Sequence, residues 1–287
     1  MTIKTSHIDG LENREIKVKD DKKVKYPFEL FSPYARVAIT GASGMGKTNA
    51  FINAWEKMYP YIDKTFVVSP TIMNDPKQKK TFLGDDGKGR DNVLVFDEPS
   101  NQLLLEIYDE LKRITKDYQD SIKTRQAYER WKKVGYDVDK LAPKDLILLD
   151  RIEYDLNKMS WTKLTKPNLV LFLDDLMGLD ILKGKVFESM IIKLRHYGCN
   201  CFVNVQTFKG LGVNSRRNMT GYMVFKTIDR TLLKSIFEET QMLWKSFDEF
   251  LELYDYATEN NHDFLYIDTL DKKYPVRKNF NTPLTSE

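Results

Sequence analysis

The chain has 287 residues, of which 41% are hydrophobic and 30% charged, and its formal net charge is +3 at pH 7. This length suits one large domain or two small ones with a substantial core, and the weak positive charge neither indicates nor opposes nucleic acid as a partner. We find neither a secretion leader nor an uninterrupted apolar run of about 18 residues. We therefore expect a soluble, intracellular protein without a membrane span.

The two ends of the chain are polar. Residues 1–26 are charged and hold too few apolar residues to form a core, so we expect an N-terminal arm. Residues 271–287 are predicted to be a polar C-terminal tail that is mobile at its end. One domain over residues 27–270 is the simplest interpretation of the remainder.

A glycine-rich turn follows the apolar run Ala35–Thr40 and precedes a helix-compatible stretch that ends near Met58. In this context the turn is typical of a phosphate-binding P-loop, because its glycines let backbone N–H groups point inward at a helix N-terminus. Lys47 would reach the β- and γ-phosphates and Thr48 would ligate magnesium, so we expect ATP and Mg²⁺ as ligands. The expected nucleotide-binding residues are Gly41, Ala42, Ser43, Gly44, Met45, Gly46, Lys47, Thr48 and Asn49.

Two short apolar runs then predict strands, Thr65–Val68 and Val93–Phe96. A basic, glycine-containing loop from Lys77 to Arg90 is expected between them.

Residues 100 to 160 predict a helical hairpin inserted into the domain. Apolar residues recur every three or four positions from Leu104 to Tyr118 and again from Leu146 to Met159, which indicates two helices separated by Gly135–Pro143. The first helix ends in a basic face, which is usually solvated; contact with DNA or with another subunit is the alternative. Its residues are Lys123, Arg125, Arg130, Lys132 and Lys133.

Past Pro167 strands and helices alternate, which predicts an α/β fold with a mostly parallel sheet flanked by helices. The expected strands are Leu169–Leu173, Asn200–Val205, Tyr222–Phe225 and Phe264–Ile267, and the expected helices lie near Val186–His196, Arg230–Glu239 and Leu243–Ala257. Cys199 and Cys201 share one face of a strand, and without a second cluster we interpret them as buried thiols rather than zinc ligands.

A P-loop needs an acidic residue at the carboxyl end of a neighbouring strand, where it holds magnesium opposite the phosphates. Asp97 and Glu98 follow one predicted strand and could supply a metal-holding Asp and a water-activating Glu. Against this interpretation, Pro99 follows at once, and Asp97 could equally cap the next helix.

Asp174 and Asp175 follow the second candidate strand, which is more strongly apolar. The next predicted strand ends at the polar Gln206. Ligands of open α/β sheets gather at the carboxyl ends of strands, so we favour Asp174 for the metal.

The order of these segments resembles the poxvirus-type genome-packaging ATPases of the FtsK/HerA superfamily, ring-forming DNA translocases with relatives in giant viruses and virophages. The resemblance covers about residues 35 to 240 and implies a RecA/FtsK-like fold. The segments that carry it are Gly41–Asn49, Leu171–Asp175, Arg195–His196, Val203–Thr207 and Arg216–Asn218.

The resemblance implies a role for each matching residue. Lys47 and Thr48 would bind phosphate and magnesium, and Asp174 would hold the metal through water. Asp175 stands where many relatives have the Glu that polarises the attacking water, although it is shorter by one methylene; capping the next helix is its alternative role. Gln206 would be the sensor of the γ-phosphate or of that water, with an ordinary strand-end amide as the alternative.

The resemblance also implies a homo-oligomeric ring, a pentamer or hexamer, in which an arginine of one subunit completes the neighbour's site. Arg217 is our first candidate, followed by Arg216 and Arg195, and for each the alternative is a structural or surface ion pair. We expect His196 to pack or to form hydrogen bonds rather than to act in catalysis.

We therefore expect an ATP-driven translocase that packages double-stranded viral DNA into a preformed capsid, in the host cell cytoplasm, in a viral factory or in association with the virion. DNA would contact basic loops, and the candidates are Lys77, Lys79, Lys80, Lys88, Arg90 and the segment Lys209–Arg217. Three alternatives stay open: a small-molecule or nucleotide kinase with the helical hairpin as a substrate lid, a non-packaging translocase of the same superfamily, and a nucleotide-regulated interaction protein.

Overall fold

The computed structural model describes residues 30–84, 89–176 and 179–285. The predicted arm over residues 1–26 and the DNA-contact candidate Lys88 lie outside the described residues.

A nine-stranded sheet with the order β3-β2-β4-β5-β1-β6-β7-β8-β9 organises the chain. The strands from β3 to β6 in that order run parallel, and β7, β8 and β9 are antiparallel to their neighbours. The predicted mostly parallel α/β sheet is therefore confirmed. The strands are β1 (Arg36–Thr40), β2 (Lys64–Val68), β3 (Val93–Phe96), β4 (Leu169–Leu173), β5 (Cys199–Val205), β6 (Gly221–Phe225), β7 (Phe264–Asp268), β8 (Val276–Lys278) and β9 (Thr282–Pro283).

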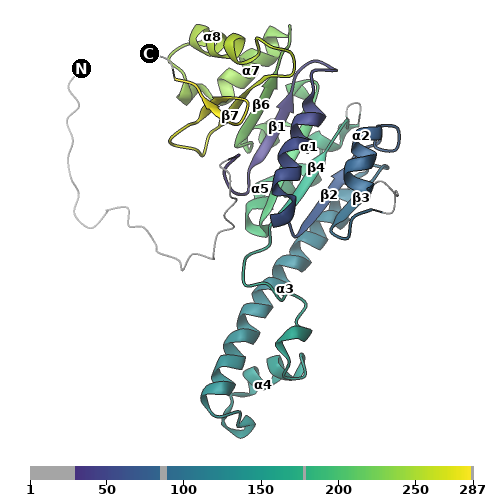
Figure 1. Ribbon diagram of the computed structural model, residues 1–287, viewed down its shortest axis with the longest axis vertical. Coiled ribbons are helices and arrows are strands. Elements are labelled where there is room, and N and C mark those ends of the chain that lie inside the picture. Colours follow the sequence, from purple (N-terminus) through teal and green to yellow (C-terminus); the bar gives the residue numbers. More distant parts are fainter. Residues whose placement is uncertain (1–29, 85–88, 177–178, 286–287) are drawn as a thin grey trace, which may run out of the picture.

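Helices cover both faces of the sheet (Figure 1). Helix α1 (Lys47–Met58) packs on one face through Phe51 and Trp55, in a cluster with alternate strand residues such as Phe172 and Phe202. The opposite face packs against α3, α5, α7 and α8. These helices span α3 (Asn101–Lys133), α5 (Lys185–Lys193), α7 (Arg230–Glu239) and α8 (Phe247–Ala257).

Burial on both faces explains the nearly continuous apolar sequence of the central strands. Every residue of β4 and β5 is buried. Cys199 and Cys201 lie in the same cluster on the α3 and α5 face, as free buried thiols. The interpretation of these cysteines as buried thiols is therefore confirmed.

Helix α3 continues well beyond the sheet, and Figure 1 shows its far end projecting from the body of the molecule beside α4 (Pro143–Asp150). Its start is capped by Ser100, whose hydroxyl accepts a hydrogen bond from the backbone N–H of Leu103 at 3.0 Å. The alternative in which Asp97 caps this helix is therefore wrong. A small separate cluster of Ala127, Leu149, Ile152 and Met159 joins the projecting end of α3 to the segment around α4.

The second predicted helix of the hairpin is much shorter than the apolar spacing indicated. Helix α4 ends at Asp150, and Glu153 and Tyr154 have the left-handed φ values of 49° and 60°, which a helix cannot accommodate. The side chains of Ile152 and Met159 still reach the same cluster because the chain folds back in a compact turn. Apolar residues of this segment therefore recur at helical spacing although the helix itself ends at Asp150.

The predicted loop from Lys77 to Arg90 is also partly helical. Pro76–Gln78 form α2, capped by Asp75, and Lys79–Leu83 continue as a single π-helical turn. Phe82 in this turn is completely buried near Phe51 and Trp55. This segment therefore begins with two short helical turns that are anchored by a buried aromatic side chain.

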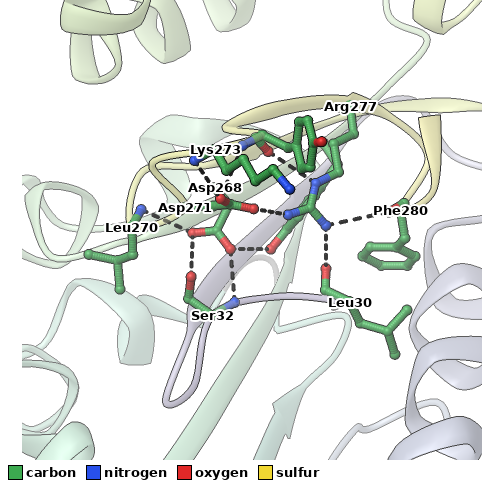
Figure 2. A network of polar contacts seen from close by, with 10 residues as sticks. Leu30, Ser32, Asp268, Leu270, Asp271, Lys273, Arg277 and Phe280 are labelled. Carbon is green, nitrogen blue, oxygen red and sulfur yellow. Dashed lines mark hydrogen bonds and ion pairs between the residues drawn. The ribbon is translucent and has the colours of Figure 1, made fainter. Parts of the chain in front are cut away.

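The predicted tail from Asp271 needs the largest correction, because residues 276–283 add β8 and β9 to the sheet. Figure 2 shows the polar network that fixes this segment to residues 30–32. The buried Arg277 forms an ion pair with Asp271, and its guanidinium also donates to the carbonyl oxygens of Leu30 and Phe280 at 3.5 and 3.4 Å. Asp268 accepts hydrogen bonds from the backbone N–H and the hydroxyl of Ser32 at 2.8 and 3.1 Å. The sequence of this strand pair is polar and lacks the apolar pattern that predicts a strand. Its polar side chain Arg277 can be buried because an ion pair and hydrogen bonds within the protein satisfy it.

In the described part of the chain, no helix is both long and apolar enough to span a membrane.

Candidate nucleotide-binding site

The P-loop connects the carboxyl end of β1 to the first turn of α1, as the sequence predicts. Gly41, Gly44 and Gly46 have φ values of 139°, 77° and 91°, which only glycine adopts easily. A Cβ atom at Gly41 would lie 2.6 Å from the Cβ of Phe225, and one at Gly46 would lie 3.0 Å from Nδ1 of His262. The backbone angles therefore favour glycine at all three positions, and the lack of space adds to this requirement at Gly41 and Gly46.

The Lys47 side chain folds back over this loop. Its Nζ atom donates to the carbonyl oxygens of Gly41 and Ala42 at 2.9 and 2.8 Å. Burial lowers the pKa of Lys47, while Asp174 and Asp175 oppose that shift. The ammonium group is thus partly desolvated and held at the mouth of the loop, where it can neutralise phosphate charge.

Asp174 lies against the first turn of α1. The hydroxyl of Thr48 donates to Oδ2 of Asp174 at 3.3 Å. The side-chain amides of Asn204 and Gln78 donate to the same carboxylate at 2.5 and 2.8 Å. Three donors from three separate segments therefore converge on one carboxylate that is only 2% exposed.

The environment of Asp174 changes its protonation. Burial raises the pKa of the carboxyl group to about 6, with a smaller contribution from the neighbouring Asp175, while the hydrogen bonds from Asn204, Thr48 and Gln78 lower it. A cation next to Asp174 would favour the ionised form, because an opposite charge offsets the cost of desolvation.

Asp175 and Gln206 lie at the same edge of the sheet. They line a cavity of about 390 Å³ together with the P-loop, Asp174 and Asn204. Asp175 has a φ of 52°, a left-handed conformation that Asp adopts more readily than most residues. The register explains Gln206, because Val205 pairs with Thr40 directly before the P-loop.

The other acidic pair lies elsewhere. Asp97 and Glu98 are exposed and follow β3, the edge strand of the sheet. Neither residue lines the cavity beside the P-loop.

The arginine candidates lie outside this cavity too. Arg217 is exposed on α6 (Val213–Arg217), so its expected action on a neighbouring subunit stays a prediction. Arg216 is engaged within the chain, 4.0 Å from Glu239 and with its guanidinium 5.3 Å from the centroid of the Phe208 ring. Arg195 lies at the amino ends of the strands, where its charge acts on Arg36.

His196 is exposed beside Arg195 and is therefore not a core packing residue. Two DNA-contact candidates are already engaged within the chain: Lys77 donates to Asn49 at 3.4 Å, and Arg90 lies 5.0 Å from the centroid of the Tyr59 ring.

The contacts of Gln78 and Asn204 with Asp174 were not predicted from the sequence. Asn204 gave one signal, because it is a polar residue inside an otherwise apolar strand and two positions before Gln206. Gln78 gave none, because α2 approaches Asp174 from 96 positions away in the sequence.

The donor set fits a hard cation such as Mg²⁺. A hydroxyl and a carboxylate oxygen lie together at the helix N-terminus, at Thr48 and Asp174. Among the described residues, the amide oxygens of Gln78 and Asn204 are buried without a hydrogen-bond partner. Oxygen atoms of this kind can accept hydrogen bonds from metal-bound water.

No protein-family model matches the sequence, and no curated protein does. Similar solved structures include the genome packaging NTPase B204 from Sulfolobus turreted icosahedral virus 2 in complex with ATP-gammaS, with a TM-score of 0.47 and 12% identity over 86% of this chain and 96% of that chain. Another is B204, the DNA-packaging ATPase from Sulfolobus turreted icosahedral virus, with a TM-score of 0.48 and 13% identity over 88% and 99% of the two chains. The cytoplasmic domain of the type VII secretion ATPase EccC from Thermomonospora curvata has a TM-score of 0.42 and 14% identity over 85% and 24%.

This chain has the mostly parallel, helix-flanked sheet and the strand–loop–helix arrangement of P-loop NTPases. The solved structures similar to it include viral genome-packaging NTPases.

Proposed function

We propose that this chain is an ATPase that hydrolyses ATP beside its P-loop and, as a ring of identical subunits, drives double-stranded viral DNA into a capsid. The observation that carries the ATPase proposal is the contact between Thr48 at the start of α1 and the buried Asp174 at the end of β4. That contact brings together two groups that a magnesium–triphosphate complex requires. Packaging would take place in the host cell cytoplasm or a viral factory, with the protein bound to the virion as a further location.

Each residue of the cavity has a separate role in this proposal. Lys47 and the backbone N–H groups of the P-loop bind the β- and γ-phosphates, and Thr48 and Asp174 hold Mg²⁺. The metal supplies charge neutralisation for the transferring phosphoryl group. Asp175 orients and polarises the attacking water, and Gln206 contacts the γ-phosphate or that water.

The arm formed by α3 and α4 argues against the kinase alternative. Glu110 in α3 forms an ion pair at 2.9 Å with Lys64, the first residue of β2, so α3 has already reached the amino ends of the strands there. The rest of the helix projects further in that direction (Figure 1). The P-loop lies at the carboxyl ends, so this arm is not a lid over the phosphate site.

The first experiment is steady-state ATP hydrolysis by the purified chain, with and without long double-stranded DNA, over a range of protein concentrations. We expect turnover to rise with DNA and more than linearly with protein concentration, because sites completed between subunits need the ring. The Lys47→Ala variant is the blank, and Lys193→Ala, which changes an exposed lysine on α5, is its matched control. Turnover per subunit that is independent of both DNA and protein concentration would contradict the proposal of a DNA-translocating ring and would indicate a simple ATPase.

A mixing experiment tests the arginine that acts on a neighbour. The Lys47→Ala and Arg217→Ala variants should each be inactive alone, and their mixture should regain part of the activity. In a mixed ring, an intact P-loop of one variant meets the intact arginine of the other. Full activity of Arg217→Ala alone would exclude Arg217 and direct the same experiment to Arg195.

A further inference from the structure

A second cavity, of about 770 Å³, lies between α1 and the β7 and β8 region. One wall is a strip of α1 in which Asn49, Asn53 and Lys57 recur every four residues, so they share one side of the helix. The opposite wall includes Phe264 and Phe280. Sites that enclose a small molecule measure roughly 300–1,000 Å³, so this cavity has room for two aromatic side chains.

Part of the hydrophobic core is left uncovered at this cavity. Ala50 and Phe280 are only half-buried, although both pack against the core cluster that includes Leu30 and Phe264. All four residues line the cavity. Figure 2 shows that Arg277 donates to the carbonyl oxygens of both Leu30 and Phe280, which fixes this apolar surface. A further aromatic side chain would extend the cluster, since Phe280 already packs edge to face on Phe264 at 5.2 Å between ring centroids.

Leu30 brings the preceding segment of the chain, residues 24–29, to this cavity. It is the first residue that the structure describes, and its side chain belongs to the core cluster beside the cavity. Before it, every second position is apolar, at Val24, Tyr26 and Phe28. Alternate residues of an extended chain share one side, and Pro27 favours extended backbone at the residue before it. An extended segment would therefore present Tyr26 and Phe28 on the same side as Leu30.

The reach of this segment matches the length of the cavity wall. An extended chain covers at most about 3.6 Å per residue, so Phe28 can lie up to about 7 Å from Leu30, and Tyr26 up to about 14 Å. Asn49 and Lys57 are eight positions apart in α1, which is about 12 Å along the helix axis. Two aromatic side chains separated by one residue can therefore both enter the cavity.

We propose that Tyr26 and Phe28 fill this cavity and hold the N-terminal segment of the same chain against α1. The same chain supplies them because Leu30 tethers the segment at the cavity, which gives it a far higher local concentration than the segment of another subunit. The inference is independent of the proposed function, because it requires no nucleotide. It gives β8 and β9 a role, since they carry the wall that receives the N-terminal segment.

Thiol labelling of the full chain without nucleotide tests this contact. Asn53→Cys places a reporter in the cavity wall, and Glu56→Cys places a matched reporter at an exposed position of α1 that does not line the cavity. The native Cys199 and Cys201 are completely buried, so the wild type gives the background. We expect a maleimide to label Asn53→Cys at least about tenfold more slowly than Glu56→Cys, because burial of an aromatic side chain favours the closed form by at least that factor.

Removal of the two aromatic side chains should abolish this protection. The double substitution Tyr26→Ser and Phe28→Ser should raise the labelling rate of Asn53→Cys to that of the matched reporter. Lys25→Ser with Glu29→Ser changes the alternate positions of the segment, so this control should leave the protection intact. An unchanged labelling rate in the variant without the aromatic side chains would overturn the inference.

Cross-linking locates the segment directly. Under mild oxidation by oxidised glutathione, Phe28→Cys combined with Asn53→Cys should form a disulfide within one chain, whereas Phe28→Cys combined with Glu56→Cys should not. A disulfide that forms only between two chains would assign the segment to a second copy, and protection of Asn53→Cys that appears only with ATPγS would assign the cavity to the nucleotide. Either result would overturn the inference, and both would leave the ATPase proposal intact.

Discussion

Two acidic pairs, Asp97-Glu98 and Asp174-Asp175, each follow the carboxyl end of an apolar strand of the same sheet, yet one pair is exposed to solvent and the other begins with a buried aspartate. The first pair follows the edge strand β3 and is exposed. The second follows β4, which lies between β2 and β5, and Asp174 is only 2% exposed. Strand order, which depends on the whole fold, therefore separates two patterns that are nearly equivalent locally.

The comparison shows what turns a strand-end carboxylate into a candidate ligand. Asp174 receives hydrogen bonds from Thr48, Asn204 and Gln78 and has a pKa raised to about 6 by burial. Such a group releases its proton more readily when a cation arrives. An exposed carboxylate after the edge strand is already ionised in water, so a nearby cation stabilises its charged form much less.

The largest expected difference between the two pairs is in ATP hydrolysis. Asp174→Ala should lower turnover by about 100-fold or more, because it removes a group proposed to hold the metal. Asp97→Ala and Glu98→Ala are matched controls at the other strand end and should stay within about twofold of wild type. Steady-state hydrolysis measures all three. A loss of activity in the two controls with an active Asp174→Ala would move the metal site to β3.

The second difference is in pH dependence. The pKa of Asp174 is raised from 3.8 in the unfolded chain to about 6 in the folded one, so the native state binds more protons between these values. Its contribution to stability therefore falls as pH rises through this interval, by up to about 3 kcal/mol. The unfolding free energy of Asp174→Asn relative to wild type, from urea titrations without nucleotide, should rise by most of that amount from pH 4 to pH 7. A constant difference would mean that Asp174 has no raised pKa.

The same ionisation should limit catalysis. Turnover of the wild type should decline at acidic pH, and in Mg²⁺ the decline should begin below the pKa of about 6 of the metal-free carboxyl group, because the metal competes with the proton for Asp174.

The third prediction concerns the donors that distinguish Asp174 from the other pair. Gln78→Ala removes a hydrogen bond of 2.8 Å that favours the ionised carboxylate. We expect turnover to fall by about tenfold and its acidic limit to move to higher pH. Gln102→Ala, which removes an exposed glutamine on α3, is the matched control. Lower turnover with an unmoved acidic limit would indicate a merely structural role for Gln78.

Most of the fold could be predicted from the sequence because the parallel strands are buried on both faces and read as apolar runs. The strands from β1 to β7 and helix α7 were anticipated almost to the residue. The strand pair from Val276 to Pro283 could not be, because its polar side chains are satisfied by the carboxylates of Asp263 and Asp271 and by the carbonyl oxygen of Leu30, all outside the strand pair itself.

The candidate site was predictable only where local sequence decides the geometry. The P-loop is local, so Lys47 and Thr48 were found from spacing alone. The distinction between Asp174 and Asp97 depended on strand order, and the approach of Gln78 depends on the tertiary position of α2.

The smallest expected effect lies at the other acidic pair and concerns stability rather than activity. Ser100 caps the 33-residue helix α3 through its hydroxyl, whereas the nearby Asp97 does not. Ser100→Ala should therefore lower the free energy of unfolding by about 1 kcal/mol, and Asp97→Ala should change it by less than about 0.5 kcal/mol. Urea denaturation measures both, and equal effects would mean that the exposed carboxylate shares in capping. With the cap assigned to Ser100, Asp97 and Glu98 are needed neither for the nucleotide cavity nor for the start of the helix, and both substitutions should leave ATP hydrolysis unchanged.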